Sequence, residues 1–237
     1  MSERTVSEAR RAAVVGAGAW GTTFACLLAE AGTPTTLWAR RDHVAAEINA
    51  GSNERYVPGR RLPEGVSATS DLGRAVEGAD LIVVAVPSQS AREVLSPLQG
   101  GLGPDVLAVS LMKGVELGTG LRMSQVLTEA LDLPAERVAV ISGPNLADEI
   151  AARQPTATVV AATDEAVAAR VAALCATSTF RPYTNTDVLG VELCGAIKNV
   201  IALAVGAAVG CGFGDNSKAT IITRGLVEIT RLGMALG

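Results

Sequence analysis

Three glycines near the start of the chain stand at a spacing that suits the binding of a phosphate group. Gly16, Gly18 and Gly21 form a G-x-G-x-x-G pattern directly after the apolar run 12–15. In a strand–turn–helix unit the first glycine allows the tight turn, the second lets a pyrophosphate approach the backbone, and the third brings helix and strand together. The pattern therefore predicts a dinucleotide site, with a helix N-terminus facing the phosphates.

Two arginines follow the next expected strand, in the stretch LWARRD. A site selective for NAD(H) has an acidic residue at this point for the ribose hydroxyls, whereas paired guanidinium groups such as those of Arg40 and Arg41 suit a 2′-phosphate. We therefore expect NADP(H) to be favoured. NAD(H) stays possible, because Asp42 is also available to the ribose.

An enzyme that oxidises an alcohol with such a cofactor needs a side chain to take the hydroxyl proton. The single histidine, His43, lies just past the second expected strand, on the adenosine side and far from the reacting end. Neither Tyr56 nor Tyr183 has a lysine four residues later, which excludes a Tyr-x-x-x-Lys reductase. The remaining candidates are the three lysines of the chain, Lys113, Lys198 and Lys218.

Lys198 lies in the apolar stretch GAIKNVIALAVGAAVG, residues 195–210. Its neighbours on a helix are small or apolar: Val191, Cys194, Gly195, Ala202 and Val205. We expect such a face to bury the lysine and lower its pKa, which suits a general acid or base. A lysine whose stem lies along the apolar face while the ammonium group reaches water is an equally open interpretation.

Two further loops follow buried strands, where open α/β sheets bind their ligands. Lys113 lies in SLMKGVE, directly after one such strand. Another strand ends at Ser142, and Gly143, Pro144 and Asn145 then open a helix whose amide groups suit an anion. An ordinary strand–helix turn remains the alternative for this second loop.

The elements that must position these residues alternate along the first part of the chain. Apolar runs predict strands at 12–18, 33–39, 80–87, 105–111, 137–143 and 156–162, with a helix at 22–32 and further helical patterns between the strands. Wholly apolar strands separated by helices indicate a doubly wound parallel sheet of Rossmann type. We assign residues 1–186 to a dinucleotide-binding domain. Residues 187–237 read as two long helices that begin a helical substrate domain.

The net charge, the cysteine spacing and the lengths of the apolar segments argue against several classes of protein. The net charge of −4 argues against nucleic acid as a partner. Four dispersed cysteines show no metal-ligand spacing, so we expect no metal, reduced thiols and a cytoplasmic location. The polar start MSERTVSEARR does not resemble a signal peptide. The longest apolar stretch, Val200 to Phe213, is shorter than the ~20 residues of a membrane span, and we expect a buried helix there.

Several segments, taken in order, are similar to the bacterial NAD(P)-dependent glycerol-3-phosphate dehydrogenases: GAGAWGT, LWARR, VPSQ, KGVE, ISGPN, GAIKNVIALAVG and ITRGLVEITRLGMALG. The resemblance covers essentially the whole chain. It implies hydride transfer between sn-glycerol 3-phosphate and dihydroxyacetone phosphate, a small phosphorylated substrate, and a supply of glycerol 3-phosphate for phospholipid synthesis. In this family the lysine of AIKN is the proton donor and acceptor. That lysine falls on Lys198, with Asn199 beside it.

The resemblance also implies particular contacts. Lys113 falls on a lysine that touches both substrate and cofactor, and Gly143 and Asn145 fall on substrate contacts. Outside the glycine loop, the implied cofactor contacts are Trp20, Arg40, Arg41, Tyr56 and Ala147. Within the loop, Ala19 stands where many relatives have serine, which removes one hydrogen bond to phosphate.

The family continues through a further helical region that binds the substrate phosphate and that this sequence does not include. We therefore expect a truncated helical domain and a homodimer through its two helices, which alone would leave apolar surface exposed. Two alternatives remain open. One is a β-hydroxyacid dehydrogenase, whose corresponding helix also carries a lysine and an asparagine. The other is a non-catalytic NADP-binding module.

Overall fold

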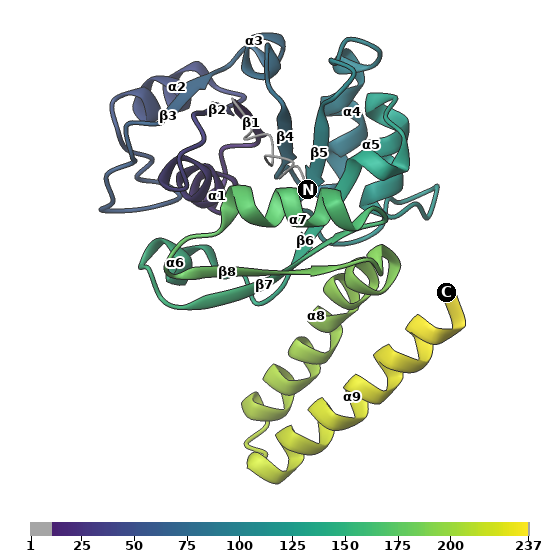
Figure 1. Ribbon diagram of the computed structural model, residues 1–237. Helices are drawn as coiled ribbons and strands as arrows, with labels where there is room; N and C mark the ends of the chain where they lie inside the picture. Colours follow the sequence, from purple (N-terminus) through teal and green to yellow (C-terminus); the bar gives the residue numbers. More distant parts are fainter. Residues whose placement is uncertain (1–10, 237) are drawn as a thin grey trace, which may run out of the picture.

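The computed structural model describes residues 11–236 and shows an eight-stranded sheet with helices on both faces (Figure 1). The strands are β1 (Ala12–Val15), β2 (Thr35–Trp38), β3 (Val66–Thr69), β4 (Leu81–Val84), β5 (Leu107–Ser110), β6 (Val138–Ser142), β7 (Thr156–Ala162) and β8 (Phe180–Asn185). They lie in the order β3-β2-β1-β4-β5-β6-β7-β8. This order confirms the doubly wound α/β fold. The prediction about the polar N-terminal segment concerns residues 1–10, which lie outside the described residues.

The last two strands depart from the expected parallel sheet. Neighbouring strands from β3 to β6 pair in parallel, whereas β7 pairs antiparallel to β6 and β8 runs parallel to β7. Neither β3 nor β8 was predicted from the sequence. Both lie at an edge of the sheet and carry polar residues at about half of their positions, so they lack the apolar pattern that marks the central strands.

The two faces of the sheet each carry an apolar layer, because successive residues of a strand point to opposite faces. On one face Val14 and Leu37 pack with α1 (Ala19–Glu30), α2 (Asp42–Asn49), α6 (Ala147–Ala151) and α7 (Glu165–Cys175). On the other face Val15 and Val84 pack with α3 (Leu72–Val76), α4 (Ala91–Leu95) and α5 (Met123–Leu131). The short 3-10 helices are η1 (Ser88–Ser90), η2 (Ser96–Leu98) and η3 (Ala135–Arg137).

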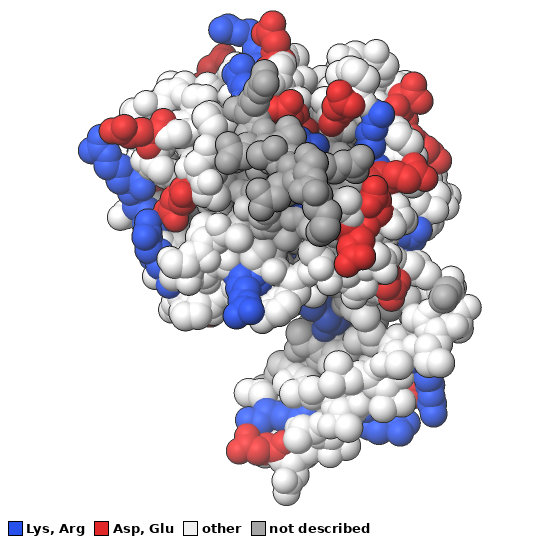
Figure 2. Space-filling model, in the orientation of Figure 1, with Lys and Arg blue, Asp and Glu red and all other residues white. Residues whose placement is uncertain are grey.

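Two long helices, α8 (Val188–Gly210) and α9 (Asp215–Leu236), lie side by side and extend away from the sheet (Figure 1). Asp187 caps α8, where its carboxylate accepts a hydrogen bond from the amide of Gly190 at 2.8 Å. The two helices approach closely where Ile201 packs against Gly225. Uncharged side chains cover most of the visible face of this pair (Figure 2).

The prediction of a buried helix over Val200 to Phe213 is wrong. Leu203 is 75% exposed and Phe213 is 59% exposed. The reason is that α8 reaches the sheet through its N-terminal turns and packs against α9 beyond them. Within residues 11–236, α8 is also the one helix that is long and apolar enough to cross a membrane by length and composition alone.

Candidate active site

The glycine loop between β1 and α1 folds as the spacing predicts. Gly16 has φ of +119°, and a Cβ atom added there would lie 2.7 Å from the carbonyl oxygen of Ala85. A Cβ atom at Gly21 would lie 1.9 Å from the carbonyl oxygen of Gly16, so only glycine lets α1 approach the loop this closely. At Gly18 an added Cβ atom would meet no atom of residues 11–236 within 4 Å. The backbone is therefore open to a ligand at the middle glycine.

The loop borders a cleft of about 750 Å³ at the carboxyl ends of β1, β2, β4 and β5. Eight of the predicted site residues line this cleft: Gly16, Gly18, Ala19, Trp20, Arg40, Arg41, Tyr56 and Lys113. Gly21 and Ala147 lie outside the lining. The helix α1 begins with Gly18 at its N-cap, and no side chain of the described residues caps its first turn. This open cradle fits a dinucleotide pyrophosphate.

Of the charged residues that follow β2, the two arginines line the cleft and the aspartate does not. Arg40 and Arg41 line it and are exposed to solvent. Asp42 starts α2 instead, where its carboxylate accepts a hydrogen bond from the hydroxyl of Ser70. His43 is exposed on the same helix. Two guanidinium groups are therefore the charges that this end of the cleft offers to a ligand.

Ser142 contacts both Lys113, which lines the cleft, and helix α8. The Nζ atom of Lys113 lies 3.4 Å from the Oγ atom of Ser142. A Cβ atom at Gly195 of α8 would lie 2.5 Å from the same Oγ atom, so α8 lies directly against the end of β6. Burial lowers the pKa of Lys113, and the positive charge of Lys198 lowers it further. Lys113 and Lys198 thus lie within electrostatic reach of one another.

Of the two interpretations left open for Lys198, the structure supports the one in which its ammonium group reaches solvent. Lys198 and Asn199 are exposed, and Nζ of Lys198 donates a hydrogen bond to Oδ1 of Asn199 at 3.3 Å. The neighbours that were expected to bury the lysine do not enclose it, because Cys194 and Ala202 are themselves exposed on α8. The half-buried lysine of this site is Lys113.

The Gly143–Asn145 segment packs against β7. The Nδ2 atom of Asn145 donates to Oγ1 of Thr158 at 2.9 Å, and that hydroxyl donates to the carbonyl oxygen of Ser142 at 3.2 Å. A Cβ atom at Gly143 would lie 3.0 Å from the same Thr158 hydroxyl. The Oδ1 atom of Asn145 is buried and has no hydrogen-bond partner among residues 11–236. The helix that follows, α6, begins at Ala147, two residues later than this segment.

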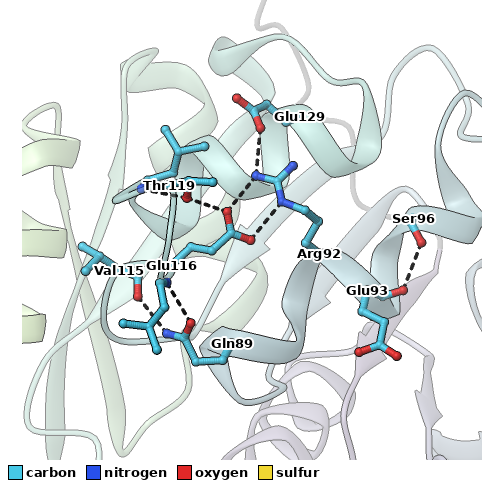
Figure 3. A network of polar contacts seen from close by, with 10 residues as sticks. Gln89, Arg92, Glu93, Ser96, Val115, Glu116, Thr119 and Glu129 are labelled. Carbon is cyan, nitrogen blue, oxygen red and sulfur yellow. Dashed lines mark hydrogen bonds and ion pairs between the residues drawn. The ribbon is translucent and has the colours of Figure 1, made fainter.

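A polar network that the sequence analysis missed holds the loop after Lys113 (Figure 3). Arg92 of α4 makes paired hydrogen bonds to Glu116, each 2.9 Å long, and an ion pair of 2.8 Å with Glu129. Gln89 donates to the carbonyl oxygen of Val115 at 2.8 Å and accepts from the amide of Leu117 at 2.9 Å. The hydrogen bonds from Arg92 lower the pKa of Glu116. No spacing signal in the sequence marks this network, since its members come from separate elements.

The strand order, the glycine cradle and the cleft at the strand ends define a dinucleotide-binding protein of the Rossmann class. The family model described as the N-terminus of NAD-dependent glycerol-3-phosphate dehydrogenase matches residues 11–168, and the model of the C-terminus of the same enzyme matches residues 187–237. The chain belongs to the NAD-dependent glycerol-3-phosphate dehydrogenase family.

Sequence and structure comparisons with individual proteins also point to this family. The glycerol-3-phosphate dehydrogenase (NAD(P)+) of Streptomyces griseus is 57% identical over 96% of this chain and 68% of the relative, and that of Thermobifida fusca is 56% identical over the same shares. Among solved structures, the glycerol-3-phosphate dehydrogenase of Coxiella burnetii has a TM-score of 0.88 at 36% identity, over 96% of this chain and 70% of that one. The enzyme of Saccharomyces cerevisiae has a TM-score of 0.84 at 32% identity, over 95% and 70%.

Proposed function

We propose that the chain transfers a hydride between sn-glycerol 3-phosphate and dihydroxyacetone phosphate, and so supplies glycerol 3-phosphate for phospholipid synthesis. The observation that carries this proposal is the meeting of the glycine-loop cleft with the Lys113–Ser142–α8 contact at one edge of the sheet. Family membership selects this substrate over the carboxylate substrates of β-hydroxyacid dehydrogenases.

The cofactor is held by the residues of the cleft. The backbone from Gly16 to Gly21 receives the pyrophosphate at the start of α1, and Trp20, Tyr56 and Lys113 line the space beside it. Ala147 lies outside the lining and remains a proposed contact. When bound, the nicotinamide accepts or gives up the hydride. The chain contributes the orientation of the ring toward the end of β5 and β6, where the two lysines lie.

The proton is moved by Lys198. During reduction of the ketone, Nζ of Lys198 gives a proton to the carbonyl oxygen as the hydride reaches the carbon, and in the reverse direction it takes the hydroxyl proton. Lys113 and Asn199 orient the substrate, and Gly143 and Asn145 contact it. The buried Oδ1 atom of Asn145, which has no partner among residues 11–236, supports a polar ligand at that position, because buried polar atoms usually find a partner.

NADP(H) is the favoured cofactor. Arg40 and Arg41 present two guanidinium groups to the ribose end of the cleft, where a 2′-phosphate would accept their hydrogen bonds. Asp42, the residue that would serve NAD(H), is held by Ser70 and does not line the cleft. NAD(H) binds more weakly in this proposal.

The remaining parts of the proposal concern the state of the protein. The exposed apolar residues of α8 and α9 support a homodimer through these helices. Four free cysteines support a cytoplasmic location, where thiols stay reduced. We assign α8 to the helical region rather than to a membrane span, because the family model of the C-terminus includes it. Sedimentation across a concentration series tests the dimer, which a constant monomer mass would contradict.

A substrate panel tests the reaction. Oxidation of NADPH with dihydroxyacetone phosphate, with its unphosphorylated analogue dihydroxyacetone, and with a β-keto acid should give turnover with the first compound alone. Turnover with the β-keto acid would instead support the β-hydroxyacid alternative. Binding of NADPH, followed by nicotinamide fluorescence, without turnover of any compound would contradict the proposed reaction and support a non-catalytic binding module.

A further inference from the structure

Glu192 is the one charged side chain on α8 that the protein buries. It is 7% exposed and accepts three hydrogen bonds. These come from a guanidinium nitrogen of Arg122 at 2.6 Å, from the amide of Ser124 at 2.7 Å and from the hydroxyl of Ser124 at 2.5 Å. A buried carboxylate is costly unless it is paired and hydrogen-bonded in this way. We call this group of three residues the Glu192 latch.

The latch also fixes the loop that follows Lys113. Arg122 closes this loop, because it forms an isolated antiparallel bridge with Val115, and the amide of Glu116 donates to the carbonyl oxygen of Leu121 at 2.8 Å. The same Arg122 then pairs with Glu192 of α8. Arg122 therefore joins the loop that starts at Lys113 to the helix that carries Lys198, through its backbone on the loop side and its guanidinium group on the helix side.

Besides the latch, a small apolar cluster, in which Val188 and Val191 pack with Val140 and Ala161, holds the start of α8 to the sheet. The buried residues of this helix are Val188, Glu192 and Gly195 in its first turns and Ala208 near its end. Lys198 follows Glu192 by six residues, about 9 Å along the helix axis. Because Gly195 lies against Ser142, a small rotation of α8 about its first turns would move Lys198 relative to Lys113.

We propose that Glu192 is a positioning residue, whose latch to Arg122 and Ser124 sets the placement of Lys198 of α8 relative to Lys113 and the end of the cleft. It does not touch the reacting atoms. The inference rests on the proposed function, because the placement of Lys198 relative to Lys113 affects turnover only if these lysines act in the proposed reaction. The placement of one lysine relative to the other can be measured separately, without any measurement of turnover.

The scarcity of lysine makes that measurement direct. A short amine-reactive cross-linker, followed by peptide mass spectrometry, reports the Lys113–Lys198 link, because the chain holds only one other lysine, Lys218. The test compares the full chain with Glu192→Ala, Glu192→Gln and the control Glu228→Ala. Glu228 is exposed on α9, where it pairs with Arg224 and Arg231 rather than with a member of the latch.

We expect Glu192→Ala to lower the yield of the Lys113–Lys198 link several-fold at a temperature where circular dichroism shows the fold intact. Glu192→Gln should rescue most of the yield, because an amide oxygen still accepts from Ser124 and Arg122. Where turnover is measurable, Glu192→Ala should lower kcat by about tenfold to a hundredfold with the KM for NADPH unchanged, as expected for a misplaced catalytic group. Glu228→Ala should match the wild type in both measurements.

An unchanged link yield in folded Glu192→Ala would overturn the inference and leave Glu192 with a stabilising role alone. If Glu192→Ala does not fold, Ser124→Ala provides the milder test. It removes one of the three donors and should lower the yield by a smaller amount, whereas a wild-type yield would contradict the inference. The proposed function is tested separately: turnover that survives Lys198→Met would remove Lys198 as the proton carrier while the latch itself stands.

Discussion

The ammonium group of Lys113 and the hydroxyl of Ser142 lie 3.4 Å apart, and this contact joins the loop after β5 to the end of β6. It lies at the same edge of the sheet as the glycine loop, where open α/β folds bind their ligands. Because Gly195 of α8 abuts the same hydroxyl, Ser142 is also one of the points where the helical pair meets the sheet. Three separate parts of the sequence therefore converge on one serine.

Gly195→Ala should disturb this convergence. The added methyl group would lie 2.5 Å from the Ser142 hydroxyl, so either Ser142 or α8 must shift, at a cost of about 1–3 kcal/mol of unfolding free energy. Gly206→Ala is the matched control on the same helix, because nothing lies within 4 Å of its added methyl group. The control should gain up to about 1 kcal/mol from higher helix propensity. Urea unfolding measures both, and equal effects of the two substitutions would contradict the contact.

The glycine loop gives a pair of opposite predictions. Gly21→Ala should destabilise the fold, because its methyl group would lie 1.9 Å from the carbonyl oxygen of Gly16. Gly18→Ala should leave thermal unfolding near that of the wild type and weaken NADPH binding by about tenfold or more, because its methyl group enters the space of the pyrophosphate. Unfolding and fluorescence titration separate the two effects. Unchanged NADPH affinity in Gly18→Ala would place the cofactor elsewhere.

Arg40 and Arg41 should decide between the two nicotinamide cofactors. The double substitution to alanine removes charge-assisted hydrogen bonds worth about 1.5–3 kcal/mol each, so NADPH affinity should fall by tenfold or more while NADH affinity changes little. Asp42→Ala is the control and should change neither affinity, because Asp42 is held by Ser70. A large loss of NADH affinity in Asp42→Ala would instead assign the ribose contact to that carboxylate.

The Arg92–Glu116 pair should make the stability of the protein depend on acid pH. Hydrogen bonds from Arg92 hold the folded-state pKa of Glu116 below its ordinary value of 4.5. The unfolded state therefore binds more protons as pH falls, and the contribution of the pair is full above pH 4.5 and is lost as pH falls through the folded-state pKa. The stability difference between the wild type and Arg92→Ala should be constant near pH 7 and shrink below pH 4.5. A difference independent of pH would show that Arg92 acts through packing alone.

The sequence predicts the parts of this protein that depend on local pattern. The glycine loop needs only its spacing and the apolar strand before it, and the structure places Gly16, Gly18 and Gly21 as predicted. The direction of β7 and the presence of β8 were not predictable in the same way. An apolar run gives a strand without its direction, and β8 is a half-polar edge strand.

The sequence could not decide between burial and exposure of Lys198 for a related reason. Apolar neighbours along a helix show that one face prefers to be covered, but they do not show what covers it. In residues 11–236 the sheet covers only the first turns of α8, and Lys198 lies beyond them. The Glu192 latch and the Arg92 network depend on contacts between residues far apart in the sequence, so no spacing rule would have found them.

The most direct test of the account is the oxidation of NADPH by this chain with dihydroxyacetone phosphate, measured for the wild type and for Lys198→Met. We expect turnover by the wild type, a loss of turnover by at least about a hundredfold in Lys198→Met, as for other general acids and bases, and the same NADPH affinity in both proteins. Turnover by Lys198→Met at the wild-type rate, or NADPH binding by the wild type without any turnover, would contradict it.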